Sequence, residues 1–528
     1  MIGTPVYLET FGCQMNELDS ELVRGQLTRV GYRMVEQPED AQVILFNTCS
    51  VREHAESKAY SRIGLIGMRK AAGEKLLLGV IGCMAERDGV DMLRRFPQVD
   101  VMCGPGELDR LPALLDAARR SEAASQAERV ALAGNRTRRS AVLSAVQDDL
   151  ETLDLSRAFD PAIAGRLRHT AQVRITRGCN KFCTYCVVPN TRGAEVHRPP
   201  DSVVDECRQL ADAGAIEVTL LGQTVNHYRY EHGAAITVQG REAPQVGPGL
   251  AAFRKAIPAG SRVTTFARLL QRIHDEVPAI QRLRFVTSYP RDFGRDVLEV
   301  MRDCPRICRY LHAPAQSGSD RILGFMNRGY TRGQYEAFVA SVFEILPDAT
   351  LAGDMIVGFP GETDADFEAT CDLVRSLPFK NNFIFKYSPR PGTTAITRFP
   401  DDVPEEVKRW RNNQLLAVQT QTSERVHAAW VGRTVPVLIE EVFAEMPAPP
   451  HQASRVELKW NNRLATPTRR AMRGHTPGDL IVALDAPPNM QAESMIGRVV
   501  QVRLESASAL LLNGKCIQTG AETVQTAD

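Results

Sequence analysis

The sequence has no apolar run near the roughly 18 residues that a membrane-spanning helix needs, so we expect no membrane partner. Neither positive nor negative charge predominates in the sequence. Its 64 Lys and Arg residues face 63 Asp and Glu residues, so any nucleic-acid site must come from a local basic patch. The first residues show no basic segment followed by an apolar stretch, which predicts a cytoplasmic protein without a secretory signal. In the cytoplasm, its 12 cysteines are expected to be thiols or metal ligands rather than disulfides.

The 528 residues suggest about three or four domains, and the first of them, residues 1–120, alternates strand and helix patterns. We expect strands at 6–8, 43–46, 76–81 and 99–102, and helices at 17–30, 52–72 and 108–119. Unbroken apolar runs such as 43–46 are typical of strands covered on both faces. The alternation therefore predicts a doubly wound parallel sheet with helices on both faces.

Cys13, Cys49 and Cys83 each follow the carboxyl end of one of these expected strands. Ligands of open α/β sheets bind at those ends, so the three thiols could converge on one metal site. The alternative is three buried structural thiols, because cysteine is among the most buried residue types. Cys103 also ends a strand, and we interpret it as structural. A linker without sustained strand runs follows at 121–164. Its basic residues, Arg129, Arg136, Arg138 and Arg139, are interpreted as solvated.

The strand expected at 173–176 leads directly into Cys179, Cys183 and Cys186, with the spacing Cys-x3-Cys-x2-Cys. Thiolates suit zinc or iron–sulfur clusters. Structural zinc usually takes four ligands, whereas three thiolates on a four-iron cluster leave one iron open. An open iron can chelate the amino and carboxylate groups of a methionine-type ligand, which is the chemical logic of radical S-adenosylmethionine enzymes. The spacing favours that chemistry, with zinc or no metal as the alternatives.

Strand and helix patterns continue through residues 165–426. Further strands are expected at 217–221, 283–287, 309–312, 351–357 and 383–387, and helices at 202–213, 266–277, 335–346 and 364–376. Six βα units predict an open (βα)6 barrel whose active residues lie at the carboxyl ends of the strands. The candidate S-adenosylmethionine contacts there are Tyr185, Gly222, Gln223, Asn226, Ser288, Gln316, Gly358 and Glu362. Taken singly, such segments are more often plain turns. Residues 228–261 break the rhythm and are interpreted as a surface insertion.

The C-terminal region changes to short strands after a helix expected at 403–426. Strands at 435–439, 456–460, 480–484 and 499–504 predict a small antiparallel β-barrel over 428–505, with a tail at 506–528. The basic residues between 455 and 475 are Arg455, Lys459, Arg463, Arg469, Arg470 and Arg473. Glu457 alone opposes them, and Trp460 offers a stacking face. This composition favours a platform for single-stranded or loop RNA over a solvated charged face.

Segments 11–16, 47–53, 178–189 and 358–363 resemble the methylthiotransferases, a radical S-adenosylmethionine family with two four-iron clusters. The resemblance covers about 1–120 and 165–505. Gln14-Met15-Asn16, Thr191-Arg192-Gly193 and Met326-Asn327-Arg328 favour the branch that modifies tRNA over the branch that modifies a ribosomal protein. The insertion 228–261 and the long linker depart from the usual compact pattern. The remaining cysteines, Cys207, Cys304, Cys308, Cys371 and Cys516, are interpreted as structural.

The resemblance implies two [4Fe-4S] clusters and S-adenosyl-L-methionine as cofactors. One cluster would bind Cys13, Cys49 and Cys83, and the other Cys179, Cys183 and Cys186. It also implies a C-terminal TRAM RNA-binding domain. The implied reaction inserts sulfur at carbon 2 of N(6)-dimethylallyladenosine next to the anticodon and methylates it. The expected partners are the anticodon stem-loop of tRNA and an electron donor protein, and we expect a monomer.

Three alternatives stay open at this stage. The first uses threonylcarbamoyladenosine in tRNA as the substrate, and the second a ribosomal-protein side chain. The third is a non-catalytic iron–sulfur protein that binds RNA. Two separate three-cysteine sites argue against the third, because a structural cluster normally has a fourth ligand.

Overall fold

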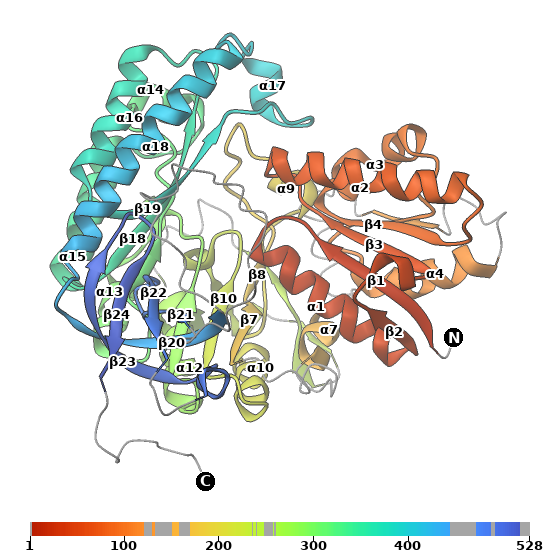
Figure 1. Ribbon diagram of the computed structural model, residues 1–528, viewed down its shortest axis with the longest axis horizontal. Coiled ribbons are helices and arrows are strands. Elements are labelled where there is room, and N and C mark those ends of the chain that lie inside the picture. Colours follow the sequence, from red (N-terminus) through yellow and green to blue (C-terminus); the bar gives the residue numbers. More distant parts are fainter. Residues whose placement is uncertain are drawn as a thin grey trace, which may run out of the picture. The chain divides into compact units, whose positions relative to one another are not determined.

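The computed structural model describes residues 3–120, 129–132, 150–157, 169–234, 236–238, 240–247, 257, 260–443, 471–486 and 491–517 (Figure 1). The chain divides into two compact units. The first comprises Met1–Ile307, Leu323–Tyr330 and Ser388–Asp402, and the second Cys308–Ile322, Thr331–Tyr387 and Val403–Asp528. No helix among the described residues is both long and apolar enough to cross a membrane.

The N-terminal part of the first unit is a six-stranded parallel sheet with the order β2-β1-β3-β4-β5-β6. Its strands are β1 (Thr4–Thr10), β2 (Tyr32–Val35), β3 (Val43–Thr48), β4 (Leu77–Gly82), β5 (Val101–Cys103) and β6 (Val130–Ala131). All six residues of β3 are buried, as its continuous apolar run predicts.

Helices cover both faces of this sheet, and each face has its own hydrophobic core. The helices are α1 (Gln14–Arg29), α2 (Glu53–Ala71), α3 (Cys83–Arg95), α4 (Leu111–Arg120) and α7 (Leu150–Arg157). Leucines of α1, α4 and α7 pack in one core, and residues of α2 and α3 pack in the other. Figure 1 shows α1 and α2 on opposite sides of the sheet. The doubly wound arrangement predicted from the sequence is present.

The segment expected as a linker, 121–164, contributes two elements to the first unit. β6 extends the sheet by pairing with β5, and α7 packs against α1. Asp154 of α7 accepts hydrogen bonds from the buried guanidinium of Arg174 at 2.7 and 3.2 Å. Glu151 of α7 pairs with Arg198 at 2.8 Å. The segment therefore supplies the counter-ions of two buried arginines. Arg136, Arg138 and Arg139 lie outside the described residues.

The central strands of the first unit form a parallel sheet with the order β16-β10-β7. Its elements are β7 (Thr170–Arg174), β10 (Glu217–Leu221), β16 (Arg282–Phe285), α10 (Pro200–Asp212), α12 (Phe266–Glu276) and α13 (Arg295–Asp303). The shorter elements of this unit are β8 (Thr176–Arg177), α9 (Val188–Thr191), β9 (Val196–His197), β11 (Arg229–Glu231), β12 (Thr237–Val238), β13 (Arg241–Glu242), β14 (Gln245–Val246), β15 (Val263–Thr265) and α17 (Thr394–Arg398). The short helix α14 (Asp320–Phe325) has residues in both units.

The segment 228–261, expected as a surface insertion, begins with buried residues. Tyr228 and Tyr230 are both fully buried. β11 pairs with β15, and β14 pairs with β9. The two tyrosine hydroxyls donate to Arg198 O at 2.7 Å and to Ala243 O at 2.8 Å, which satisfies their buried polar atoms. The parts that form β11 and β14 are therefore integrated into the first unit, whereas β12 and β13 pair with each other and Ile236 and Ile257 are exposed.

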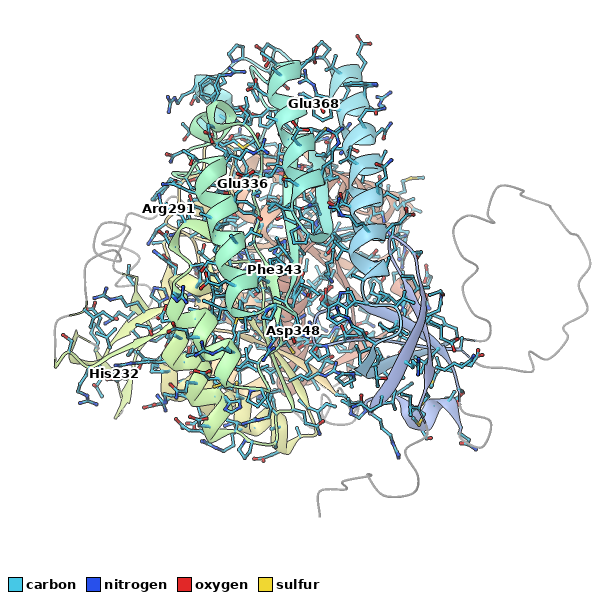
Figure 2. The ribbon with its side chains drawn as sticks, turned by 90° about the vertical axis from the view of Figure 1, so that its left-hand side faces the viewer. His232, Arg291, Glu336, Phe343, Asp348 and Glu368 are labelled. Carbon is cyan, nitrogen blue, oxygen red and sulfur yellow. The ribbon has the colours of Figure 1, made fainter. Side chains whose placement is uncertain are left out.

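The second unit continues the βα pattern with a parallel sheet of the order β17-β18-β19. Its elements are β17 (Tyr310–His312), β18 (Thr350–Val357), β19 (Phe379–Lys386), α15 (Arg332–Ile345), α16 (Asp364–Ser376) and α18 (Glu405–Ala428). Thr331 and Thr363 begin α15 and α16 with capping boxes. Figure 2 labels Glu336 on α15 and Glu368 on α16. The two central sheets supply the six parallel strands that the sequence predicts.

Five strands at the C-terminus close into a barrel with the order β20-β21-β22-β24-β23. They are β20 (Thr434–Phe443), β21 (Ala471–His475), β22 (Ile481–Asp485), β23 (Val499–Ala507) and β24 (Leu512–Cys516). All pairs are antiparallel except β22 with β24. β24 lies in the segment expected as a tail, so the barrel extends beyond residue 505. The strand expected at 456–460 lies outside the described residues.

Candidate metal centres

The first three cysteines lie where three neighbouring strands of the N-terminal sheet end. Cys13 follows β1 and precedes α1, Cys49 follows β3, and Cys83 is the first residue of α3 after β4. A hydrogen bond between the Cys13 and Cys49 thiols lowers the pKa of Cys13 and raises that of Cys49, and negative charge on Cys83 raises the pKa of Cys49 further. The three thiols are therefore close enough to influence each other's ionisation.

Glycine allows this close approach at two positions. Gly12 has a φ of +123°, and a Cβ placed there would lie 2.4 Å from the Cβ of Cys49. Gly82 has a φ of +91°, and its Cβ would lie 2.4 Å from Asn47 Oδ1. Other residues rarely adopt these backbone angles, and any side chain would push the cysteine loops apart.

Two asparagines connect the loops that carry the first thiols. Asn16 Nδ2 donates to Asn47 Oδ1 at 3.0 Å and to Thr48 O at 2.8 Å. Asn47 Nδ2 donates in return to Asn16 O at 2.8 Å, and Cys13 Sγ donates to Asn16 Oδ1 at 3.3 Å. Sequence reasoning assigned these asparagines no role, although both stand in the motifs that carry the family resemblance. They fix the loop after β1 against the loop after β3.

Arg192, which follows α9 in the central part of the chain, places a positive charge beside the first triad. Its Nη2 donates to Asp19 Oδ2 at 2.8 Å and to Asn16 Oδ1 at 3.3 Å. Burial raises the pKa of Cys83, and the guanidinium of Arg192 opposes that rise. Arg192 also favours the thiolate of Cys13. Sequence analysis could not predict the contact between Arg192 and Asp19, because the two residues are 173 positions apart.

The second triad lies on the loop that follows β8. Gly178 has a φ of +72°, and a Cβ there would lie 2.1 Å from Ala194 O, so only glycine fits at the start of the loop. Burial, Glu195 and Cys183 together raise the pKa of Cys179 to about 11. Burial and the other two thiols raise the pKa of Cys186. These three thiols also interact with one another.

Both triads fit a four-iron cluster held by three protein ligands. Cys49, Cys83, Cys179 and Cys183 are buried, and Cys13 and Cys186 are half-buried. Within the part of the chain that the structure describes, no three His, Cys, Asp or Glu side chains are grouped so that they could hold a single metal ion. The ligands of a cluster bind different iron atoms and so need a wider spacing.

The candidate S-adenosylmethionine contacts of the first unit differ in whether their polar groups already have a hydrogen-bond partner within the protein. Asn226 exchanges hydrogen bonds with the backbone of Tyr289 at 2.8 and 3.0 Å, which fixes the loop after β16. A Cβ at Gly222 would lie 2.7 Å from the Thr176 side chain. Gln223 is half-buried. Ser288 Oγ is buried and has no hydrogen-bond partner among the described residues, so it can still bind a ligand.

Three further candidates lie on the second unit. Gln316 has a φ of +76°, and its Oε1 is buried without a hydrogen-bond partner in the described residues. Gly358 has a φ of +69° and donates its N–H to Glu362 Oε2 at 2.6 Å. Glu362 also accepts from Arg411 at 2.9 Å, while burial raises its pKa to about 7. Glu362 therefore stabilises the loop that contains Gly358.

Most of the basic residues expected to bind RNA lie outside the described residues. These are Arg455, Lys459, Arg463, Arg469 and Arg470. Arg473 lies in β21, where it pairs with Glu441 of β20 at 2.7 Å and stacks over Phe443 at 4.9 Å. Its charge is therefore balanced across the barrel strands.

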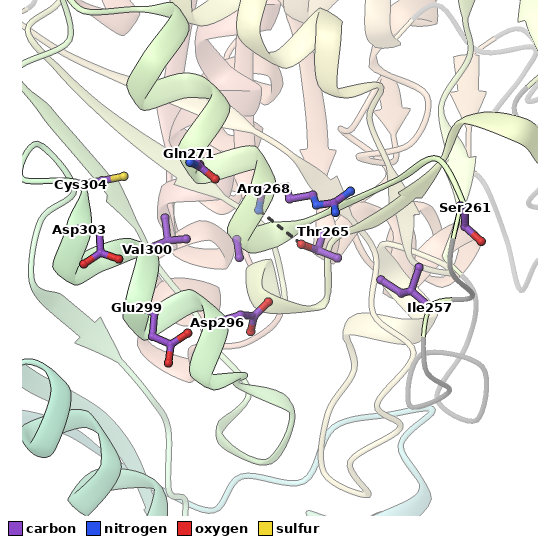
Figure 3. A pocket seen from close by; sticks show the side chains of 12 residues that line it. Ile257, Ser261, Thr265, Arg268, Gln271, Asp296, Glu299, Val300, Asp303 and Cys304 are labelled. Atoms are coloured by element: carbon purple, nitrogen blue, oxygen red, sulfur yellow. Dashed lines mark hydrogen bonds between the residues drawn. The ribbon is translucent and has the colours of Figure 1, made fainter.

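A separate cavity of about 660 Å³ lies between α12 and α13 (Figure 3). Arg268, Gln271, Asp296 and Glu299 line it together with Cys304. Thr265 caps α12 beside it by accepting from Arg268 N at 3.4 Å. None of the predicted site residues lines this cavity, so it is separate from the two triads.

Comparison with known proteins gives matches over both cysteine-bearing regions. Residues 5–104 match the uncharacterized protein family UPF0004, and residues 173–374 match the radical SAM superfamily. The tRNA-2-methylthio-N(6)-dimethylallyladenosine synthase of Rhodopirellula baltica is 40% identical over 97% of this chain and 95% of its own length. The protein of the same name from Burkholderia mallei is 37% identical over 97% of both chains.

Among solved structures, the radical S-adenosylmethionine methyltransferase TsrM from Kitasatospora setae, with cobalamin and a [4Fe-4S] cluster bound, superposes with a TM-score of 0.51. It is 15% identical and covers 75% of this chain and 74% of its own. The fold and the three-cysteine loop after β8 thus define a radical S-adenosylmethionine protein. With its N-terminal domain and its full-length relatives, the chain belongs to the tRNA-2-methylthio-N(6)-dimethylallyladenosine synthase family of methylthiotransferases. The family and the fold class predicted from the sequence are confirmed.

Proposed function

We propose that the protein inserts sulfur at carbon 2 of N(6)-dimethylallyladenosine beside the anticodon of tRNA and methylates that sulfur. The observation that carries this proposal is the pair of largely buried thiol triads, one at the ends of β1, β3 and β4 and the other after β8. Membership of the family supports the choice of substrate.

The two triads hold two [4Fe-4S] clusters in this proposal. When bound, the cluster on Cys179, Cys183 and Cys186 supplies one-electron cleavage of S-adenosylmethionine, and the cluster on Cys13, Cys49 and Cys83 supplies the sulfur site. Such chemistry is needed because carbon 2 of adenine is neither acidic nor electrophilic enough for acid–base catalysis. The chain contributes thiolates, fixed loops and exclusion of water.

The proposed contacts to S-adenosylmethionine in the first unit are Tyr185, Gly222, Gln223, Asn226 and Ser288. Ser288 is supported best, because its buried hydroxyl has no partner among the described residues. Asn226 acts by holding the backbone of Tyr289, next to Ser288. On the second unit, Gln316, Gly358 and Glu362 stay predictions.

The partner proposed from the family is tRNA, bound through its anticodon stem-loop. Loop bases can be splayed out and presented to a protein pocket, which suits chemistry on a base beside the anticodon. An electron donor protein, a monomeric state, a TRAM-type role for the C-terminal barrel and a cytoplasmic location stay predictions.

Mass spectrometry of bulk tRNA nucleosides tests the substrate. Cells lacking the gene are expected to lose 2-methylthio-N(6)-dimethylallyladenosine and to accumulate N(6)-dimethylallyladenosine. The wild-type gene restores the product, and a Cys183→Ala gene does not. Loss of a methylthiolated threonylcarbamoyladenosine, or an altered ribosomal-protein mass with unchanged tRNA, would instead identify one of the alternative substrates.

The basic residues before β21 give a second prediction. Replacing Arg469 and Arg470 together by alanine should weaken tRNA binding. It should also reduce the slope of log affinity against log salt by roughly one unit for each phosphate that the variant no longer binds. Cleavage of S-adenosylmethionine without tRNA should be nearly unchanged. Salt titrations of tRNA binding, run beside a 5′-deoxyadenosine assay, measure both effects.

Arg375→Ala is the matched control for that experiment. Arg375 is an exposed arginine of α16 that pairs with Asp372 and with Glu368, labelled in Figure 2. Its removal should leave the salt slope unchanged. Equal tRNA affinity of the double variant and the wild type at every salt concentration would assign Arg469 and Arg470 to a solvated face.

A further inference from the structure

Arg328 belongs to the Met326-Asn327-Arg328 motif, which has no role in the chemistry described so far. It is only 5% exposed and lies in the same unit as the second thiol triad. Its Nη1 donates to Cys183 Sγ at 3.4 Å and to Tyr185 Oη at 3.4 Å. Its Nε donates to Tyr330 Oη at 2.9 Å. A buried guanidinium thus contacts one of the three proposed cluster ligands directly.

Aromatic rings surround this guanidinium. It lies 4.7 Å from the ring centre of Tyr289 and 5.3 Å from that of Tyr330. Arginine is not deprotonated in proteins, so this buried guanidinium carries a positive charge. Electrostatic effects are stronger in such water-poor surroundings than at the surface.

The backbone next to Arg328 is fastened to the cysteine loop. Thr184 N donates to Met326 O at 3.1 Å, and Thr184 Oγ1 donates to Phe325 O at 2.8 Å. Asn327 Nδ2 donates to Phe182 O at 3.0 Å, where Phe182 has a φ of +52°. The hydroxyl of Tyr289 donates to Arg328 O. These contacts fix the guanidinium at the Cys183 sulfur.

A hydrogen bond and a positive charge at a ligand sulfur stabilise the reduced cluster more than the oxidised one, because reduction adds negative charge. Hydrogen bonds to the sulfurs are among the protein features that set the potential of an iron–sulfur cluster. We propose that Arg328, by donating to Cys183 Sγ, raises the reduction potential of the cluster held by Cys179, Cys183 and Cys186. This inference rests on the proposed function, because it needs a cluster at that triad.

Arg192 provides a matched comparison. Its side chain is 4% exposed, and it too is a buried arginine in the first unit, but its partners are Asp19 and Asn16 beside the first triad. Removing Arg192 therefore removes a buried positive charge, here one paired with Asp19, without removing the hydrogen bond to Cys183. Its effect on the second cluster isolates what is particular to Arg328.

The experiment uses the full-length protein with Cys13, Cys49 and Cys83 replaced by alanine, so that only the second cluster contributes. After anaerobic reconstitution, its iron content is measured first. A chemical redox titration followed by electron paramagnetic resonance then gives the potential of the one-electron reduction. Arg328→Gln, Arg328→Lys and Arg192→Gln are compared in this protein.

Arg328→Gln should lower the equilibrium constant for reduction roughly tenfold, which corresponds to about 59 mV for one electron. Arg328→Lys keeps the charge and should give a smaller shift in the same direction. Arg192→Gln should leave this potential unchanged. Unchanged potentials in both Arg328 variants with full iron, or an equal shift in Arg192→Gln, would overturn the inference.

Iron measurements separate failure of this inference from failure of the proposed function. About four irons in the parent protein support the proposed ligands, since the second triad holds one four-iron cluster. No iron in the parent would refute those ligands and the inference with them. Loss of iron from both Arg328 variants, with full iron in the parent, would refute the inference alone, because Arg328 would then serve assembly of the site.

Discussion

Replacing Cys179, Cys183 and Cys186 together by alanine is expected to abolish cleavage of S-adenosylmethionine and to halve the iron content. The wild-type protein should hold about eight irons and the variant about four, since each triad is proposed to hold one four-iron cluster. Cleavage should fall below detection, because the variant lacks the three thiolates proposed to hold the cluster that would supply it. Anaerobic reconstitution, iron analysis and a 5′-deoxyadenosine assay measure both effects.

Cys304→Ala is the control for this prediction. Cys304 and Cys308 repeat the Cys-x3-Cys spacing of Cys179 and Cys183, and Cys304 lines the cavity between α12 and α13. Its replacement should leave about eight irons, because Cys304 is not among the proposed ligands of either cluster. A wild-type content near four irons, or tightly bound zinc, would contradict the two-cluster assignment.

Cys49→Ala should separate the two steps of the reaction. It removes the proposed ligand that follows the middle strand, β3, and whose thiol is hydrogen-bonded to that of Cys13. The second triad is left complete, so some 5′-deoxyadenosine should still form. No methylthiolated nucleoside should appear, because the proposed sulfur site is lost.

The measurement for Cys49→Ala combines the 5′-deoxyadenosine assay with nucleoside mass spectrometry of the same reaction. Cys103→Ala serves as a buried control, since Cys103 also ends a strand of this sheet but donates its thiol to Glu107 O at 3.1 Å. That variant should make product. Equal loss of cleavage in Cys49→Ala and Cys183→Ala would contradict the division of roles.

Strong local patterns explain which elements the sequence predicted well. The strand at 217–221 and the helix at 364–376 were predicted with the bounds of β10 and α16. Both combine a clear hydrophobic period with distinct ends, such as Thr363 before α16. The placement of Cys13, Cys49 and Cys83 at one edge also followed, because parallel strands end together.

Weak local patterns explain what the sequence missed. β21 and β24 are short and contain glycine and charged residues, and their burial depends on closing the barrel. α7 has only eight residues, and its position depends on the pairing of Asp154 with Arg174. Such pairs join residues that are distant in sequence, so the hydrophobic period of a short segment cannot predict them.

By itself, the sequence determined the family, the order of βα units and the two cysteine triads, because spacing and hydrophobic period are local properties of the chain. Only the tertiary structure decided what stands beside each triad. Arg192 reaches Asp19 and the first triad, and Arg328 reaches Cys183, at sequence separations of 173 and 145 residues. These contacts arise because burying a guanidinium requires hydrogen-bond acceptors, and folding alone brings those acceptors to it.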